Sequence, residues 1–78
     1  MEVVIADDAE HEDLFADIGD EKMYWGRVIY DRATERFMLS IFYFAGKDEY
    51  VFPLGEVQTA LERARKRLTE LGYGAKTE

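Results

Sequence analysis

The sequence predicts an α+β fold, in which a small antiparallel β-sheet packs against one long C-terminal α-helix. Aromatic and β-branched residues concentrate between residues 22 and 52, and an apolar stripe of helical period follows between residues 54 and 71. The turns between the strand candidates are short, which favours antiparallel pairing. A chain of 78 residues is the size of one domain. We therefore expect a single domain over residues 1–73 and a disordered tail over residues 74–78.

The N-terminal quarter predicts a strand followed by a short acidic helix. Residues 1–6 include three consecutive β-branched residues, which favour a first strand, and this strand could join either edge of the sheet. Asp7 and Glu10 have the spacing of a capping box, and the apolar residues that follow give one side of a helix about ten residues long. Gly19 is placed to end that helix.

Three further strands are predicted at residues 22–31, 37–44 and 50–52, with polar turns between them. Pro53 ends the last strand because proline has no N–H for the ladder. The short connections make a three-stranded antiparallel meander the simplest pairing. The predicted order of elements is therefore β-α-β-β-β-α.

The longest periodic segment predicts a helix over residues 54–71. Its apolar residues recur at spacings of three and four and form one narrow stripe: Val57, Leu61, Ala64, Leu68 and Leu71. Gly72 is expected to end the helix, with Tyr73 folding back over the last turn in a Schellman motif.

Acidic charge is concentrated at the start of the chain. The first 21 residues hold nine carboxylates and no Lys or Arg, whereas the remainder holds eight carboxylates and all ten Lys and Arg. Asp7, Asp8 and Glu10 would favour the start of a helix through its dipole. The other acids would repel one another at helical spacing. These surplus acids are the candidate partner-binding residues: Glu12, Asp13, Asp17, Asp20 and Glu21.

Three interpretations of the acidic segment compete. The first is a solvated face, partly neutralised by the protein's own basic helix. The second is a docking surface for a basic protein, for which the sharpest version is a phage- or plasmid-type inhibitor that mimics nucleic acid, of the anti-CRISPR or anti-restriction kind. A metal site is the third, but its residues have neither EF-hand nor H-E-x-x-H spacing: Asp7, Asp8, Glu10, His11 and Asp13. We expect no metal and no cofactor.

The aromatic residues indicate a second candidate surface. One helix can cover only one face of the sheet, so the other face requires the acidic helix, a second copy of the chain or a different protein. In the first case the aromatic residues are all core, and in the others they form an interface. The candidate dimer or apolar interface residues are Tyr24, Trp25, Tyr30, Phe42 and Phe44.

Several functional classes are disfavoured. Ion pairs within a helix and the helix dipole account for most of the basic cluster Arg63, Arg65, Lys66 and Arg67. Arg63 and Arg67 lack a clear helical partner, so they could bind phosphate or meet the acidic segment of the same or another chain. The net charge of −7 opposes direct binding of nucleic acid. The chain has no cysteine, one histidine and no glycine-rich phosphate loop, and Ser40 lies in an apolar strand as an expected core residue, so we expect no enzyme. No signal-peptide pattern and no apolar run of membrane-spanning length occur.

The sequence therefore predicts a cytoplasmic, non-enzymatic protein-binding module. The leading hypothesis is that the surplus acids dock on a basic surface of a partner, such as a nucleic-acid enzyme. The alternative is a homodimeric structural or regulatory module, antitoxin-like, that assembles through its aromatic sheet.

Overall fold

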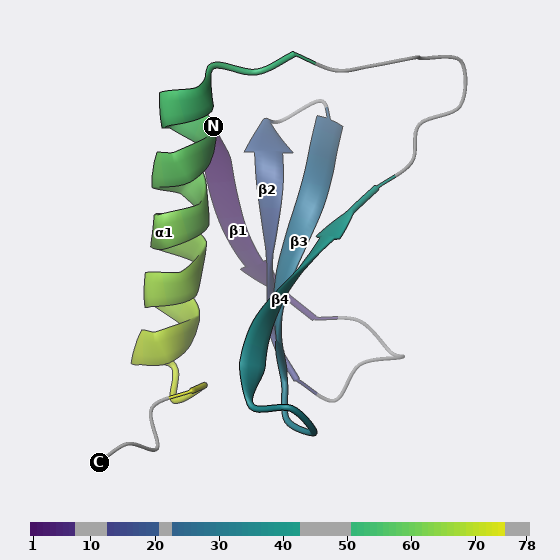
Figure 1. Ribbon diagram of the computed structural model, residues 1–78, viewed down its shortest axis with the longest axis vertical. Coiled ribbons are helices and arrows are strands. Elements are labelled where there is room, and N and C mark those ends of the chain that lie inside the picture. Colours follow the sequence, from purple (N-terminus) through teal and green to yellow (C-terminus); the bar gives the residue numbers. More distant parts are fainter. Residues whose placement is uncertain (8–12, 21–22, 43–50, 75–78) are drawn as a thin grey trace.

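The computed structural model describes residues 1–7, 13–20, 23–42 and 51–74 (Figure 1). Four strands precede one helix: β1 (Glu2–Ala6), β2 (Phe15–Asp20), β3 (Met23–Asp31), β4 (Arg36–Ile41) and α1 (Leu54–Glu70). The strands form one antiparallel sheet in the order β1-β2-β3-β4, and α1 packs against β1, β2 and β3. The α+β class, the four-stranded antiparallel sheet and the long C-terminal helix are thus confirmed.

The predicted acidic helix is wrong where the structure describes it, because residues 15–18 lie in β2. The remainder of that prediction, residues 8–12, lies outside the described residues. Apolar residues on β2 alternate with a period of two: Ala16 and Ile18 bury in the core with α1, while Phe15 buries on the opposite face of the sheet. A strand therefore buries apolar side chains on both faces, which a helix with a single apolar side cannot do.

Gly19 lies inside β2 rather than at the end of a helix. The pairing of β2 with β3 shifts register between Ile18 and Gly19, so that Trp25 on β3 has no partner on β2. This β-bulge brings the main chains so close that a Cβ on Gly19 would overlap the backbone of Met23 and Tyr24. The bulge also turns the Trp25 ring into the core beneath α1.

The predicted strand at residues 50–52 is also wrong for its described part. Val51 and Phe52 have no strand pairing, and residue 50 lies outside the described residues. Phe52 instead packs its ring against Trp25, with the ring centroids 5.4 Å apart. The first strand takes the edge beside β2, which leaves β4 as the other edge of the described sheet.

The helix α1 follows the prediction closely at its C-terminal end. Its last turn closes in a Schellman motif, in which the Gly72 N–H donates to the Thr69 carbonyl at 3.0 Å and the Tyr73 N–H donates to the Leu68 carbonyl at 3.0 Å. Gly72 has a φ of +107°, which glycine adopts without strain. The buried helix residues are Ala60, Ala64 and Leu68. Leu71, predicted to belong to the apolar stripe, is exposed instead.

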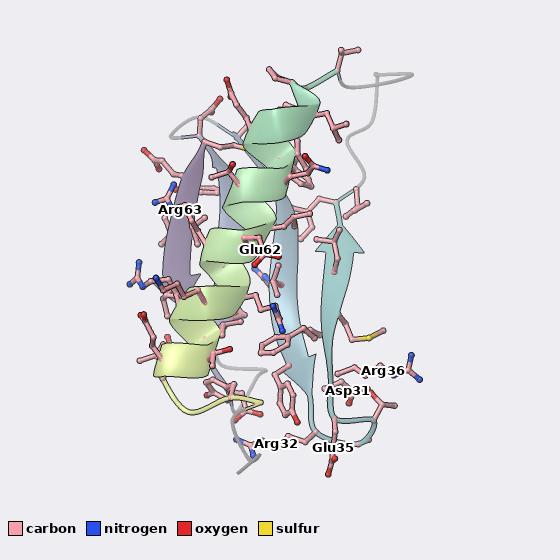
Figure 2. The ribbon with its side chains drawn as sticks, turned by 60° about the vertical axis from the view of Figure 1, so that its left-hand side comes forward. Asp31, Arg32, Glu35, Arg36, Glu62 and Arg63 are labelled. Atoms are coloured by element: carbon pink, nitrogen blue, oxygen red, sulfur yellow. The ribbon has the colours of Figure 1, made fainter. Side chains whose placement is uncertain are left out.

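The helix covers only part of the sheet. Leu39 pairs with Val28 and Ile41 pairs with Gly26, so both β4 residues face the side on which α1 lies. They are nevertheless 43% and 70% exposed, because α1 lies over β1 to β3. Figure 2 shows β4 standing to one side of the helix, with the charged β3–β4 turn at its lower end. Among the described residues, the fold therefore leaves the part of β4 from Met38 to Ile41 largely exposed.

Candidate functional site: the uncovered edge strand and the acidic face

Asp17, one of the five predicted partner-binding residues, forms an ion pair within the chain. Asp17 on β2 lies directly across the ladder from Arg27 on β3. The Arg27 Nε donates to the Asp17 Oδ1 at 2.7 Å, and the Nη2 donates to the Oδ2 at 3.4 Å. The guanidinium also stacks on the Phe15 ring, 3.7 Å from its centroid. Asp17 therefore belongs to a part-buried cluster on the face of the sheet opposite α1.

Asp13 is also paired within the chain. The Arg32 guanidinium binds it with two hydrogen bonds of 2.9 Å, and the Tyr73 hydroxyl donates to the Asp13 Oδ1 at 3.5 Å. The hydrogen bond from Arg32 holds the pKa of the Asp13 carboxyl below its usual value, and the same pair raises the pKa of Arg32. The Tyr73 hydroxyl also accepts the Leu14 N–H at 3.0 Å. Asp13 thus helps to fix the start of β2 to the end of α1.

The remaining predicted acids divide into one exposed residue and two that the structure does not describe. Asp20 is exposed at the end of β2, where its Oδ1 accepts the Met23 N–H at 3.1 Å. Glu12 and Glu21 lie outside the described residues. The structure therefore does not bring the five acids together as one unpaired surface. Two of them are neutralised by Arg27 and Arg32, rather than by the basic helix that the sequence had indicated.

The predicted aromatic interface residues are used mainly inside the fold. Trp25 is buried in the core, and its indole N–H has no partner among the described residues. Tyr30 packs against the rings of Phe37 and Tyr73 at centroid distances of 5.2 Å and 6.4 Å. Phe42 lies 5.4 Å from the Arg27 guanidinium.

Tyr24 is half-buried on the sheet face opposite α1. Its hydroxyl donates to the Glu2 carboxylate at 3.2 Å. Burial, followed by that hydrogen bond, raises the pKa of Tyr24. The last predicted interface residue, Phe44, lies outside the described residues. The aromatic residues that the structure describes therefore present no continuous exposed surface.

The exposed apolar residues are aliphatic and concentrate on β4. Met38 and Leu39 are 44% and 43% exposed and point to opposite faces of the sheet, and Ile41 is 70% exposed. The sequence contained a signal for this surface, since residues 37–44 are apolar on both faces except at Ser40. Ser40 itself is exposed, so its expected place in the core is wrong.

A shallow groove lies between α1 and β4. It has a volume of about 190 Å³, and its floor includes Val28 and Leu39. Leu61, Glu62 and Arg65 line it from the helix. The Arg65 Nη1 lies 3.8 Å from the Glu62 Oε1, and the Arg65 guanidinium carbon lies 5.9 Å from the centroid of the Phe37 ring. The strand β4 thus borders a mainly apolar groove that Glu62 and Arg65 also line.

The basic residues of α1 have local roles where a contact is observed. The Arg63 guanidinium donates to the Met1 carbonyl at 3.4 Å, which ties the helix to the start of β1. In Figure 2, Arg63 points toward β1 and away from β4. Arg65 pairs with Glu62 as described above. Lys66 and Arg67 are exposed.

No metal-binding arrangement occurs in the described ranges 1–7, 13–20, 23–42 and 51–74. Of the five residues considered for such a site, Asp7 and Asp13 are described, and Asp8, Glu10 and His11 are not. Within the part of the chain that the structure describes, no helix has both the length and the apolar character to cross a membrane.

No protein-family model, no curated protein and no solved structure matches this chain significantly. The function is therefore inferred from the chain's own surface chemistry.

Proposed function

We propose that this protein is a non-catalytic, cytoplasmic protein-binding module that engages its partner through β4. The observation that carries the proposal is the exposure of an apolar edge strand that α1 leaves uncovered. An exposed edge presents main-chain N–H and C=O groups that a second strand can pair with. Strand addition of this kind supplies affinity through the main chain and specificity through alternate side chains.

The composition of β4 supports a binding role. Natural edge strands are commonly protected by lysine, proline, bulges or inward-pointing charges. The strand β4 (RFMLSI) has one charged residue, Arg36 at its first position, and its pairing with β3 is regular throughout. The Leu39 side chain lines the groove beside α1, and Ile41 faces the same side of the sheet. A partner strand would therefore gain both main-chain hydrogen bonds and apolar contacts.

The proposal is tested by comparing two lysine substitutions in a pull-down from the native host. Ile41→Lys places a charge on the β4 surface, while Leu54→Lys is a matched control because Leu54 is 71% exposed at the start of α1. We expect the wild type and Leu54→Lys to retain the same partner and Ile41→Lys to lose it. Equal retention by all three proteins contradicts a binding role for β4.

A second candidate function is docking of the acidic segment on a basic partner, with inhibition of a nucleic-acid enzyme as its sharpest form. The separation of acidic from basic residues in the fold supports this second candidate. Every described acid that precedes β3 lies on or beside β1 and β2, whereas the described bases lie on β3, β4, α1 and the turns. Asp7 and Asp20 are exposed, so these two residues would make the first contact with the partner.

Charge reversal separates this second candidate from the first. Asp7→Lys together with Asp20→Lys should weaken binding to a basic partner and reduce its dependence on salt, because clustered carboxylates act through long-range attraction. Ile41→Lys serves as the comparison. Binding that is insensitive to salt and to the acidic substitutions contradicts the electrostatic mode.

A further inference from the structure

We infer that the partner at β4 is a second copy of this chain, and that the two copies form one continuous eight-stranded antiparallel sheet about a two-fold axis at Leu39. The inference rests on the proposed role of β4 and names its occupant. Four features support it: the direction of the main-chain groups, the register they allow, the placement of charge and the area available.

The outward main-chain groups of β4 belong to its odd-numbered residues. The Phe42 N–H donates to the Trp25 carbonyl at 2.9 Å, so this pair is hydrogen-bonded across the β3–β4 ladder. Hydrogen-bonded and non-hydrogen-bonded pairs alternate along an antiparallel ladder. The N–H and C=O groups of residues 38 and 40 therefore point toward β3. Those of Phe37, Leu39 and Ile41 point outward, away from the sheet.

These groups allow a self-complementary register. With the two-fold axis at Leu39, Leu39 forms a hydrogen-bonded pair with Leu39 of the second copy, and Phe37 pairs with Ile41 of the second copy. Both are pairs of residues with outward main-chain groups. Their side chains lie on the helix-facing side of both copies, so this row is entirely apolar. On the opposite face, Met38 lies across from Ser40 of the second copy.

Charge favours this edge over the other one. The described acids that precede β3, namely Glu2, Asp7, Asp13, Asp17 and Asp20, lie on or beside β1 and β2, and β3 separates these two strands from β4. Pairing through β4 puts the two β1 strands at opposite ends of the joined sheet, seven spacings or about 33 Å apart. This separation far exceeds the screening length of about 8 Å at physiological salt. Near the interface, the groove rim carries Glu62 and Arg65, whose charges cancel.

The exposed aliphatic side chains supply about half of the area that a small, specific interface needs. The exposed fractions of Met38, Leu39 and Ile41 add up to about one and a half fully exposed side chains. At on the order of 150 Å² each, they contribute roughly 500 Å² across both copies. The edge main chain, Phe37 and the groove rim must supply a similar area to reach the roughly 1,000 Å² of the smallest specific interfaces. The pairing is therefore expected to be reversible.

The first test is the mass of the purified protein in solution. We expect the wild type to have twice the mass of one chain at high concentration, and to keep it in raised salt because apolar burial is not screened. Ile41→Lys should raise the dissociation constant at least about tenfold, and Leu54→Lys should change it less than about twofold. A monomeric wild type at about 1 mM, or a dimer unaffected by Ile41→Lys, overturns the inference.

The second test determines the register by single cysteines, which the cysteine-free chain allows. Leu39 and Met38 are almost equally exposed, so Leu39→Cys and Met38→Cys form a matched pair. On the two-fold axis, the Cα atoms of residue 39 in the two copies lie about 5.5 Å apart, within reach of a disulfide. The two copies of residue 38 are diagonal neighbours at about 7–8 Å. Under mild oxidation, Leu39→Cys should crosslink at least about tenfold faster. Equal rates, or a faster Met38→Cys, overturn the register.

The two proposals fail in different ways. A monomeric wild type whose Ile41→Lys variant still loses a host partner overturns self-pairing but leaves β4 as a binding surface. Retention of that partner by Ile41→Lys removes the proposed function whatever the mass of the protein.

Discussion

Substitutions at Asp17 and Arg27 test whether an acid in the charged N-terminal segment stabilises the fold. Arg27 lies between the Asp17 carboxylate, 2.7 Å from its Nε, and the Phe15 ring, 3.7 Å from its guanidinium carbon. Replacing Arg27 with Met removes the charge but keeps an apolar chain against Phe15. Replacing Asp17 with Asn keeps the size of that side chain and removes its charge.

The expected cost follows from the burial of the pair. The two side chains are 24% and 18% exposed. Exposed ion pairs contribute at most about 1 kcal/mol, and breaking a buried pair costs about 3–5 kcal/mol. At this intermediate burial we expect Asp17→Asn to cost about 2 kcal/mol. Arg27→Met should cost about 3 kcal/mol, because it also loses the stacking on Phe15, worth about 1 kcal/mol.

Urea denaturation of both single variants and the double variant measures the coupling between the two residues. We expect a coupling free energy of about 1–2 kcal/mol. Each kcal/mol corresponds to about 4–8 °C in the melting temperature of a domain this small. Asp7→Asn is the control, since Asp7 is exposed, and should change stability by less than about 0.5 kcal/mol. Single-variant costs as small as the control, with no coupling, would refute a structural role for Asp17.

Three further outcomes are expected. Gly19→Ala should destabilise the protein by about 3 kcal/mol or more, since its Cβ overlaps main chain, whereas Gly55→Ala meets no atom and should stabilise α1 by about 0.5–1 kcal/mol in the same denaturation assay. The Arg32 hydrogen bond lowers the pKa of Asp13, so the ionised Asp13 carboxylate stabilises the fold above its ordinary pKa of 3.8, and this stabilisation is lost as pH falls through the folded-state pKa. Asp13→Asn should therefore flatten the fall in melting temperature over that pH range. Tyr73→Phe should cost about 1 kcal/mol by leaving a main-chain N–H at the start of β2 without its acceptor.

The elements that could be predicted from sequence are those with strong local signals. The helix α1 has an apolar stripe, and its end at Gly72 and Tyr73 forms the predicted Schellman motif. The strand β3 agrees with the aromatic and β-branched run within one residue. Both elements follow from properties of neighbouring residues, so no distant contact was needed to predict them.

The elements that could not be predicted depend on distant contacts. The local spacing of apolar residues around Ala16 predicts a short helix. The segment forms β2 instead, because β1 and β3 pair with it and the Arg27 guanidinium donates a hydrogen bond to Asp17. The bulge that requires Gly19 exists only once β3 is beside it. Two of the surplus acids therefore have partners within the fold, because Asp17 on β2 and Asp13 just before it each pair with an arginine.

The candidate surface on β4 also depends on contacts between residues that are distant in the sequence. A strand that is apolar on both faces, next to a single helix, indicated that some apolar surface would remain uncovered. Which residues are uncovered depends on where α1 crosses the sheet, and it crosses over β1 to β3. Aliphatic residues of β4 are exposed as a result, while Trp25 and Tyr30, two of the five predicted interface residues, pack inside the fold.

Amide hydrogen exchange along β4, measured as a function of protein concentration, tests the binding role of this strand most directly. The N–H groups of residues 38 and 40 point toward β3 and should exchange slowly at every concentration. Those of Leu39 and Ile41 point outward, so they should exchange rapidly in dilute protein and become protected as the concentration rises. Rapid exchange at Leu39 in concentrated protein, while residues 38 and 40 stay protected, would contradict pairing of β4 with a second copy.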